Sequence, residues 1–106
     1  MSQNRSKSLG TLGLAMKSGN IASGEFLTEQ AIRAGTARLV IVAEDASDNT
    51  KKKFRNSCSY YQVPLAIQFD KDTLGNAIGK EFRASLAVLD QGFASAISKN
   101  LELEEM

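Results

Sequence analysis

The sequence predicts an α/β protein: a three-layer α/β/α sandwich built on a small, mixed, four-stranded sheet. Helical signals alternate with short apolar runs along the 106 residues, which is typical of a sheet with helices on both faces. The clearest run, Leu39–Val42, has four consecutive apolar residues, as expected for a central strand buried on both faces. Glu44 and Asp45 follow it closely, and such a strand carries its C-terminal loop to the edge where α/β folds bind ligands.

Two helices and two strands are predicted in the first half of the chain. Their expected bounds are Ser8–Ser18 and Glu25–Ala34 for the helices, and Ile21–Ala22 and Leu39–Ala43 for the strands. Ser8 is the expected N-cap of the first helix. In the second helix Leu27, Ala31 and Ile32 are expected to face inward, and Gly35 is expected just after its end.

Three helices and two strands are predicted in the second half. Their expected bounds are Asp48–Tyr61, a short helix capped by Thr73 and closed by Gly79, and Gln91–Leu101 for the helices, and Leu65–Phe69 and Ala84–Leu89 for the strands. Ser47 or Asp48 is the expected cap of the first of these helices, and Pro64 prevents its continuation. The side chains expected to face inward are Phe54, Cys58 and Tyr61 in the first of these helices, and Phe93, Ala96, Ile97 and Leu101 in the last.

A single domain is expected over residues 8–101, preceded by a flexible segment, 1–7, and followed by an acidic tail, 102–106. No apolar run approaches the roughly 18 residues that a membrane-spanning helix needs, so no membrane partner is expected. The one cysteine, Cys58, cannot form a disulfide within the chain, and residues 1–13 make a poor signal peptide. A cytoplasmic location is therefore expected. A homo-oligomer is compatible with the sequence, but nothing in the sequence indicates one.

The composition argues against an enzyme. The chain contains no histidine, which removes the commonest general base and the commonest metal ligand, and its single cysteine makes a zinc site improbable. Glu44 and Asp45 are a candidate acid–base pair, but adjacent side chains diverge, which favours a role in bracing the loop. Residues 75–81 resemble a phosphate-binding loop, yet Glu81 stands where a hydroxyl is required. No catalytic residue, cofactor or metal ion is expected.

The charge distribution restricts how the chain can bind nucleic acid. The net charge is +1, whereas a protein that binds nucleic acid by general electrostatic attraction is far more basic. Lys51, Lys52, Lys53 and Arg55 look like a basic patch, but successive helix residues fan out by about 100°, which favours a solvated helix face. DNA is not expected as a partner, and any contact with RNA must be local and depend on shape.

An ordered set of motifs resembles the kink-turn RNA-binding family of ribosomal proteins (the L-seven-Ae superfamily), and more closely its bacterial YlxQ-type branch. The resemblance covers about Leu9–Leu101. The matching blocks lie at residues 12–15, 23–25, 31–35, 37–47, 49–53, 58, 60–64, 74–80 and 90–94.

The resemblance implies a non-enzymatic, ribosomal or ribosome-associated protein that binds a kinked or bulged structured RNA. Family members hold their RNA with the N-terminal turn of the second helix and the loop before the last strand, here residues 24–30 and 79–85. Gly24 would let the RNA backbone approach closely, and Phe82 would stack on a splayed-out nucleotide. The RNA-binding residues implied in this way are Lys17, Gly24, Glu25, Phe26, Leu27, Gln30, Arg33, Asp45, Lys80, Glu81, Phe82, Arg83 and Ala84.

Three positions depart from the family pattern. Typical kink-turn binders carry Asn, Glu and Lys in the second helix to read guanines, and here those positions hold Phe26, Leu27 and Gln30. The departure is compatible with the YlxQ-type branch and points to a relaxed or different RNA target. It also leaves open an alternative, a protein-interaction adaptor on the same fold, because apolar groups suit a protein surface.

Overall fold

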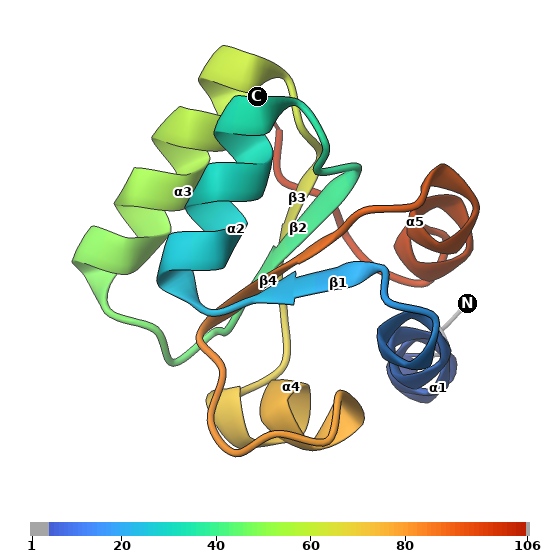
Figure 1. The fold of residues 1–106 in the computed structure, drawn as a ribbon. Coiled ribbons are helices and arrows are strands. Elements are labelled where there is room, and N and C mark those ends of the chain that lie inside the picture. Colours follow the sequence, from blue (N-terminus) through green and yellow to red (C-terminus); the bar gives the residue numbers. More distant parts are fainter. Residues whose placement is uncertain (1–4, 106) are drawn as a thin grey trace.

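Residues 5–105 are described in a computed structural model, and within them five helices surround one four-stranded sheet (Figure 1). The helices are α1 (Arg5–Lys17), α2 (Glu25–Ala34), α3 (Asp48–Tyr61), α4 (Lys71–Ala77) and α5 (Gln91–Ser98). The strands are β1 (Ile21–Ser23), β2 (Leu39–Val42), β3 (Leu65–Ile67) and β4 (Ser85–Val88). No helix in this part of the chain is long and apolar enough to cross a membrane.

The sheet has the strand order β1-β4-β2-β3 and is mixed, as predicted. Strands β2 and β3 are parallel, with Val40 opposite Leu65, whereas β4 runs antiparallel to both β1 and β2. Helices α2 and α3 cover one face and α1 and α5 the other, while α4 lies at one end of the sheet (Figure 1). The predicted α/β/α sandwich is therefore confirmed.

The core lies on both faces of β2 and β4. Every residue of these two strands is buried, which confirms that Leu39–Val42 is a central strand. Phe54 of α3, Ile32 of α2 and Ile97 of α5 are fully buried against the sheet. Burial of this apolar surface is the main force that holds the helices on the sheet.

Helices α2 and α3 have the bounds that the sequence predicts because their end signals are local. Ser47 accepts a hydrogen bond from the backbone N–H of Thr50 at the start of α3. Gly35 follows α2 with φ of 77°, and its N–H donates to carbonyl groups in the last turn of that helix.

Helix α1 begins earlier than the sequence predicts. It starts at Arg5, so residues 5–7 are helical, and residues 1–4 of the predicted flexible segment lie outside the described residues. The prediction of Ser8 as N-cap is wrong: Ser8 is fully buried inside the helix, and its hydroxyl donates to the carbonyl oxygen of Ile97 in α5. A contact between residues 89 positions apart leaves no local signal.

Helix α4 also starts earlier than predicted. Its N-cap is Asp70, whose carboxylate accepts a hydrogen bond from the N–H of Thr73, so the prediction of Thr73 as the cap is wrong. This bond lowers the pKa of Asp70, because the N–H stabilises the ionised carboxylate. Both aspartate and threonine are suitable N-cap residues, and here the cap is Asp70, the earlier of the two in the chain.

Three side chains that were expected inside are exposed: Leu27 in α2, Tyr61 in α3 and Ala96 in α5. In α2 the buried face is made by Thr28, Ala31 and Ile32, so Leu27 lies just outside it. Helix α5 ends at Ser98 rather than at the predicted Leu101, although Leu101 is buried as expected. Beyond it, the N–H of Glu104 donates to the carbonyl oxygen of Leu65, so the acidic tail runs beside β3.

Candidate functional site

Two segments far apart in the sequence lie together at the end of the molecule where α2 and α3 begin (Figure 1). We call residues 24–27, the first turn of α2 with its N-cap, and residues 79–84, the loop before β4, the helix–loop surface. The N–H of Gly24 donates to the carbonyl oxygen of Ser85 at 2.9 Å. Beneath that turn, the buried hydroxyls of Thr28 and Ser85 lie 3.4 Å apart. These contacts hold the start of α2 against β4.

The first turn of α2 is open to a ligand. Gly24 has φ of 93° and ψ of 161°, a conformation that disfavours any side chain, and no side chain caps the helix. The first N–H groups of a helix have no partner within it, and they carry the positive end of the helix dipole. Backbone amides at such a turn bind phosphate or base oxygens well.

Arg83 ties the loop 79–84 to the end of β1, directly before Gly24. Its Nε donates to the hydroxyl of Ser23 at 3.2 Å, and its Nη1 donates to the carbonyl oxygen of Phe82 at 2.7 Å. The N–H of Arg83 also donates to the carbonyl oxygen of Lys71, the first residue of α4. The two side-chain bonds use two of the five guanidinium N–H groups, and the other three remain as donors for a phosphate.

A hollow of about 230 Å³ lies beside this loop, between Asp45, Lys71, Asp72 and Phe82. The side chain of Phe82 is 64% exposed, so one wall of the hollow is an aromatic ring open to solvent. Asp45 accepts a hydrogen bond from the N–H of Lys71 at 3.0 Å, which ties the loop after β2 to α4. Asp45 thus braces the loop and also borders the hollow.

A second hollow, of about 290 Å³, lies along the exposed side of α2. Phe26, Gln30 and Arg33 line it from α2, together with Glu29, and Lys53 lines it from α3. Three of the residues implied by the resemblance therefore lie on one helix face. Lys53, which was expected on a solvated helix face, lies beside them.

The remaining residues implied by the resemblance fall into two groups. The first group, in the helix–loop surface, consists of Glu25, Leu27, Lys80, Glu81 and Ala84, and all of these but Ala84 are exposed. Lys17 ends α1 before β1, whereas Gly24 follows β1, so the strand separates Lys17 from the site. Lys17 is exposed, and its role as an RNA-binding residue stays a prediction.

The four cations within residues 51–55 of α3 point in different directions, as expected from the rotation of about 100° between successive helix residues. Lys53 pairs with Glu25 of α2, whereas Arg55 pairs with Glu104 of the tail. Lys52 is exposed, and Lys51 is partly buried. They do not form one basic patch.

Neither candidate for chemistry forms a reactive centre. Asp45 faces the start of α4, whereas Glu44 lines a separate hollow with Glu102 and Glu104, so the two carboxylates diverge as expected. Cys58 is fully buried. This burial, and to a smaller extent the negative charge of Glu29, raise the pKa of its thiol to about 12. The thiol stays protonated at neutral pH. Among residues 5–105, no three His, Cys, Asp or Glu side chains gather to hold a metal ion.

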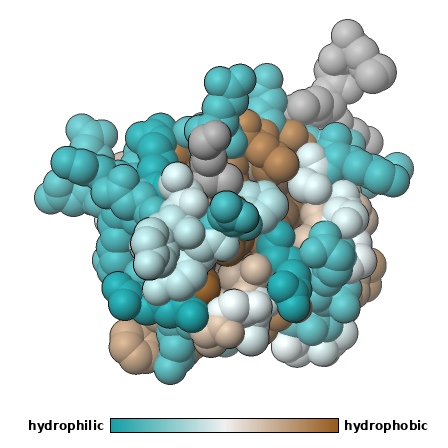
Figure 2. Space-filling view, turned by 90° about the horizontal axis from the view of Figure 1, so that it is seen from above, coloured by the Kyte–Doolittle hydropathy of each residue, from teal (hydrophilic) through white to brown (hydrophobic). Residues whose placement is uncertain are grey.

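The opposite end of the molecule, seen in Figure 2, is covered mostly by polar residues with small separate apolar patches. The helix–loop surface carries two exposed rings, Phe26 and Phe82, beside the open start of α2.

Comparison with known proteins identifies the family. The profile of the Ribosomal protein L7Ae/L30e/S12e/Gadd45 family matches residues 6–98. The chain belongs to this family. The match spans both segments of the helix–loop surface, and it is a match to RNA-binding and ribosomal proteins rather than to enzymes.

Relatives within the L7Ae/L30e/S12e/Gadd45 family include proteins named RNA-binding protein YlxQ. The Bacillus subtilis protein is 45% identical, over 86% of this chain and 91% of its own length. The Enterococcus faecium protein is 41% identical, over 93% of this chain and 95% of its own length. The resemblance to the YlxQ-type branch is thereby confirmed.

Solved structures show the same fold. A protein of unknown function from Bacillus halodurans superposes with a TM-score of 0.85 and 36% identity, covering 88% of this chain and 94% of the other. A Giardia lamblia 15.5kD RNA binding protein has a TM-score of 0.78 and 21% identity, covering 94% of this chain and 90% of the other. At that identity the second likeness concerns the fold alone.

Proposed function

We propose that this protein binds structured RNA at the helix–loop surface, and that its target is a kinked or bulged element of the kink-turn kind in ribosomal or another cellular RNA. The observation that carries the proposal is that the open first turn of α2 and the loop 79–84 lie together, with Gly24 bonded to Ser85 and Arg83 bonded to Ser23, the residue before Gly24. Family membership and similarity to RNA-binding protein YlxQ support it.

Each part of the surface offers a contact that unpaired or sharply bent RNA requires. The amides after Gly24 suit phosphate or base oxygens, and Arg83 supplies further donors for a phosphate. Phe82 presents a ring on which a splayed-out base can stack. The net charge of +1 gives no general attraction, so affinity depends on the RNA placing its groups at these points.

Phe26, Leu27 and Gln30 determine how strictly the RNA is read. Phe26 and Leu27 are 76% and 47% exposed and carry no side-chain polar atom, whereas the amide of Gln30 can donate and accept. We therefore propose that recognition of G·A pairs is relaxed, and that stacking and backbone contacts contribute most of the affinity.

Replacing Phe82 with alanine is expected to weaken binding to a structured RNA about tenfold, because stacking contributes about 1–3 kcal/mol per base. The fold should be unaffected, because Phe82 is largely exposed. Filter-binding titration at near-physiological salt measures the change. Tyr60→Ala is the matched control, since Tyr60 is 80% exposed but lies in the last turn of α3. Equal losses in the two variants would contradict a role for the loop ring.

A second candidate function, a protein-interaction adaptor, is favoured by the exposure of Phe26 and Leu27 on adjacent positions of α2. Exposed apolar neighbours of this kind suit the core of a protein interface. An adaptor would bind every RNA weakly and with the same salt sensitivity, whereas an RNA-binding protein of this family discriminates between RNA structures.

A further inference from the structure

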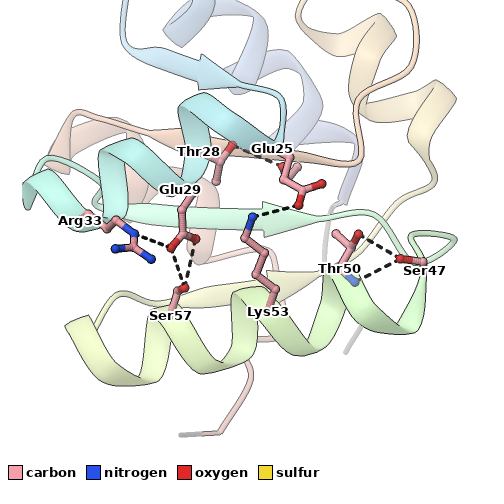
Figure 3. Close-up of polar contacts among 9 residues, drawn as sticks. Glu25, Thr28, Glu29, Arg33, Ser47, Thr50, Lys53 and Ser57 are labelled. Atoms are coloured by element: carbon pink, nitrogen blue, oxygen red, sulfur yellow. Dashed lines mark hydrogen bonds and ion pairs between the residues drawn. The ribbon is translucent and has the colours of Figure 1, made fainter.

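The hollow between α2 and α3 contains side chains that match one nucleotide. Figure 3 shows the two helices side by side, with Glu25 facing Lys53 and Glu29 facing Ser57. Both pairs join residues 28 positions apart, so the helices run parallel and in register. Phe26, Gln30 and Arg33, at successive turns of α2, form one wall of the hollow, and Lys53 forms the other.

Phe26 supplies a stacking surface. Its side chain is 76% exposed, although a phenylalanine ring gains about 1.5–3 kcal/mol when it is buried. Gln30 lies one turn later on the same helix face, and its amide can donate to and accept from the edge of a base.

Two cations from different helices border the same hollow, with the Glu29 carboxylate between them (Figure 3). Lys53 Nζ lies 2.9 Å from Glu25 Oε2, and Arg33 Nε lies 2.9 Å from Glu29 Oε2. Arg33 uses only Nε in that pair, so its terminal N–H groups can reach an anion. Glu29 is turned toward α3, where the hydroxyl of Ser57 donates to both of its oxygens.

We propose that this hollow is an RNA subsite that adjoins the helix–loop surface and shares Phe26 with it, and that it takes one unpaired nucleotide with its base on Phe26 and its phosphate on Lys53. The subsite extends the proposed RNA binding, on which it rests, to a strand that leaves the helix–loop surface along α2. Lys53 becomes a binding residue there. Glu25 competes with the phosphate for the ammonium group of Lys53. The phosphate can displace Glu25, because the ion pair is solvent-exposed and therefore weak.

Chemical-shift mapping with penta-adenylate, an unpaired RNA with strongly stacking bases, tests the subsite directly. In the labelled full-length chain, the amides of Phe26, Gln30, Arg33 and Lys53 are expected to shift during the titration. Shifts confined to loop 79–84, or spread over the whole surface, would overturn the proposal.

Substitutions of the two partners in the Glu25–Lys53 ion pair should change the affinity for penta-adenylate in opposite directions. Glu25→Gln should strengthen binding of penta-adenylate a few-fold, because it frees Lys53 for the phosphate. Lys53→Gln should weaken binding and lower the salt slope by about one, because one phosphate contact is lost. Lys52→Gln, at the exposed neighbouring position of α3, is the control and should leave the slope closer to the wild-type value.

Phe26→Ala should weaken binding about tenfold, whereas Phe26→Tyr, which retains a ring, should not. Equal affinities of the alanine and tyrosine variants would overturn stacking on this ring. A chain that binds penta-adenylate here but binds no structured RNA would refute the proposed function and support the subsite.

A chain that binds structured RNA tightly but shows none of these effects would refute the subsite and support the proposed function.

Discussion

Replacing Gly75 with alanine is expected to destabilise the protein by at least about 3 kcal/mol, since overpacked sites cost about 1–3 kcal/mol and occasionally more. A Cβ at this position would overlap the backbone carbonyl of Glu81. Backbone cannot rotate aside as a side chain can, so α4 and loop 79–84 would have to separate. For a chain of this size the loss corresponds to a fall in Tm of roughly 12–24 °C.

Thermal unfolding followed by circular dichroism measures this effect. Gly10→Ala is the matched control, because Gly10 lies inside α1 and a Cβ there meets nothing within 4 Å. That substitution should raise stability by about 0.5–1 kcal/mol, because alanine favours a helix more than glycine does. A Gly75→Ala variant as stable as the wild type would show that loop 79–84 does not pack on α4 as described.

Replacing Arg83 with glutamate is expected to abolish binding of structured RNA, with a loss of at least about 100-fold at near-physiological salt. The substitution removes the bonds to Ser23 and to the carbonyl oxygen of Phe82. It also places a negative charge where phosphates are expected, and like charges across an interface cost several kcal/mol. Electrophoretic mobility shift with a single structured RNA measures the loss.

Two further variants separate the causes. Lys99→Glu makes the same change of charge at an exposed position after α5, on the other face of the sheet, and should cost far less affinity. Arg83→Gln adds no negative charge and should lower the salt slope by about one if the guanidinium holds a phosphate. An Arg83→Glu variant that folds normally and binds as well as the wild type would refute the helix–loop surface.

Arg83 is a cleaner test than Gly24. Gly24→Glu is also expected to abolish RNA binding, because its side chain would occupy the open first turn of α2. However, the φ of 93° at Gly24 strains any L side chain, so that variant loses stability as well. The two effects cannot be separated at this position.

Much of the fold could be predicted because its signals are local. The burial of Leu39–Val42 follows from composition, and the bounds of α2 and α3 follow from Gly35 and Ser47. Predictions failed where a distant contact decides the outcome. Ser8 looks like a cap in the sequence, but it is buried because its hydroxyl reaches α5. Leu27 has helical spacing with Ala31, yet the buried face of α2 passes through Thr28 instead.

The candidate site was only partly readable from the sequence. The sequence placed Gly24 and loop 79–84 in one surface through resemblance, whereas the bond from Arg83 to Ser23, 60 positions away, leaves no local signal. The ion pair of Lys53 with Glu25 was not predicted, because a run of lysines does not reveal which one faces a neighbouring helix. Lys17 ends α1, and its proposed contact with RNA stays a prediction.

Titration of the purified protein against a kink-turn RNA and a matched RNA without its G·A pairs tests the central proposal most directly. Salt must be held near physiological strength with magnesium present, because phosphate contacts alone produce weak binding at low ionic strength. We expect tight binding to the intact kink-turn and clearly weaker binding to the matched RNA, because an RNA that is not kinked does not place its phosphates and its splayed-out base at the helix–loop surface. Equal, weak binding to both would contradict recognition of a kinked RNA and would make the adaptor the leading function.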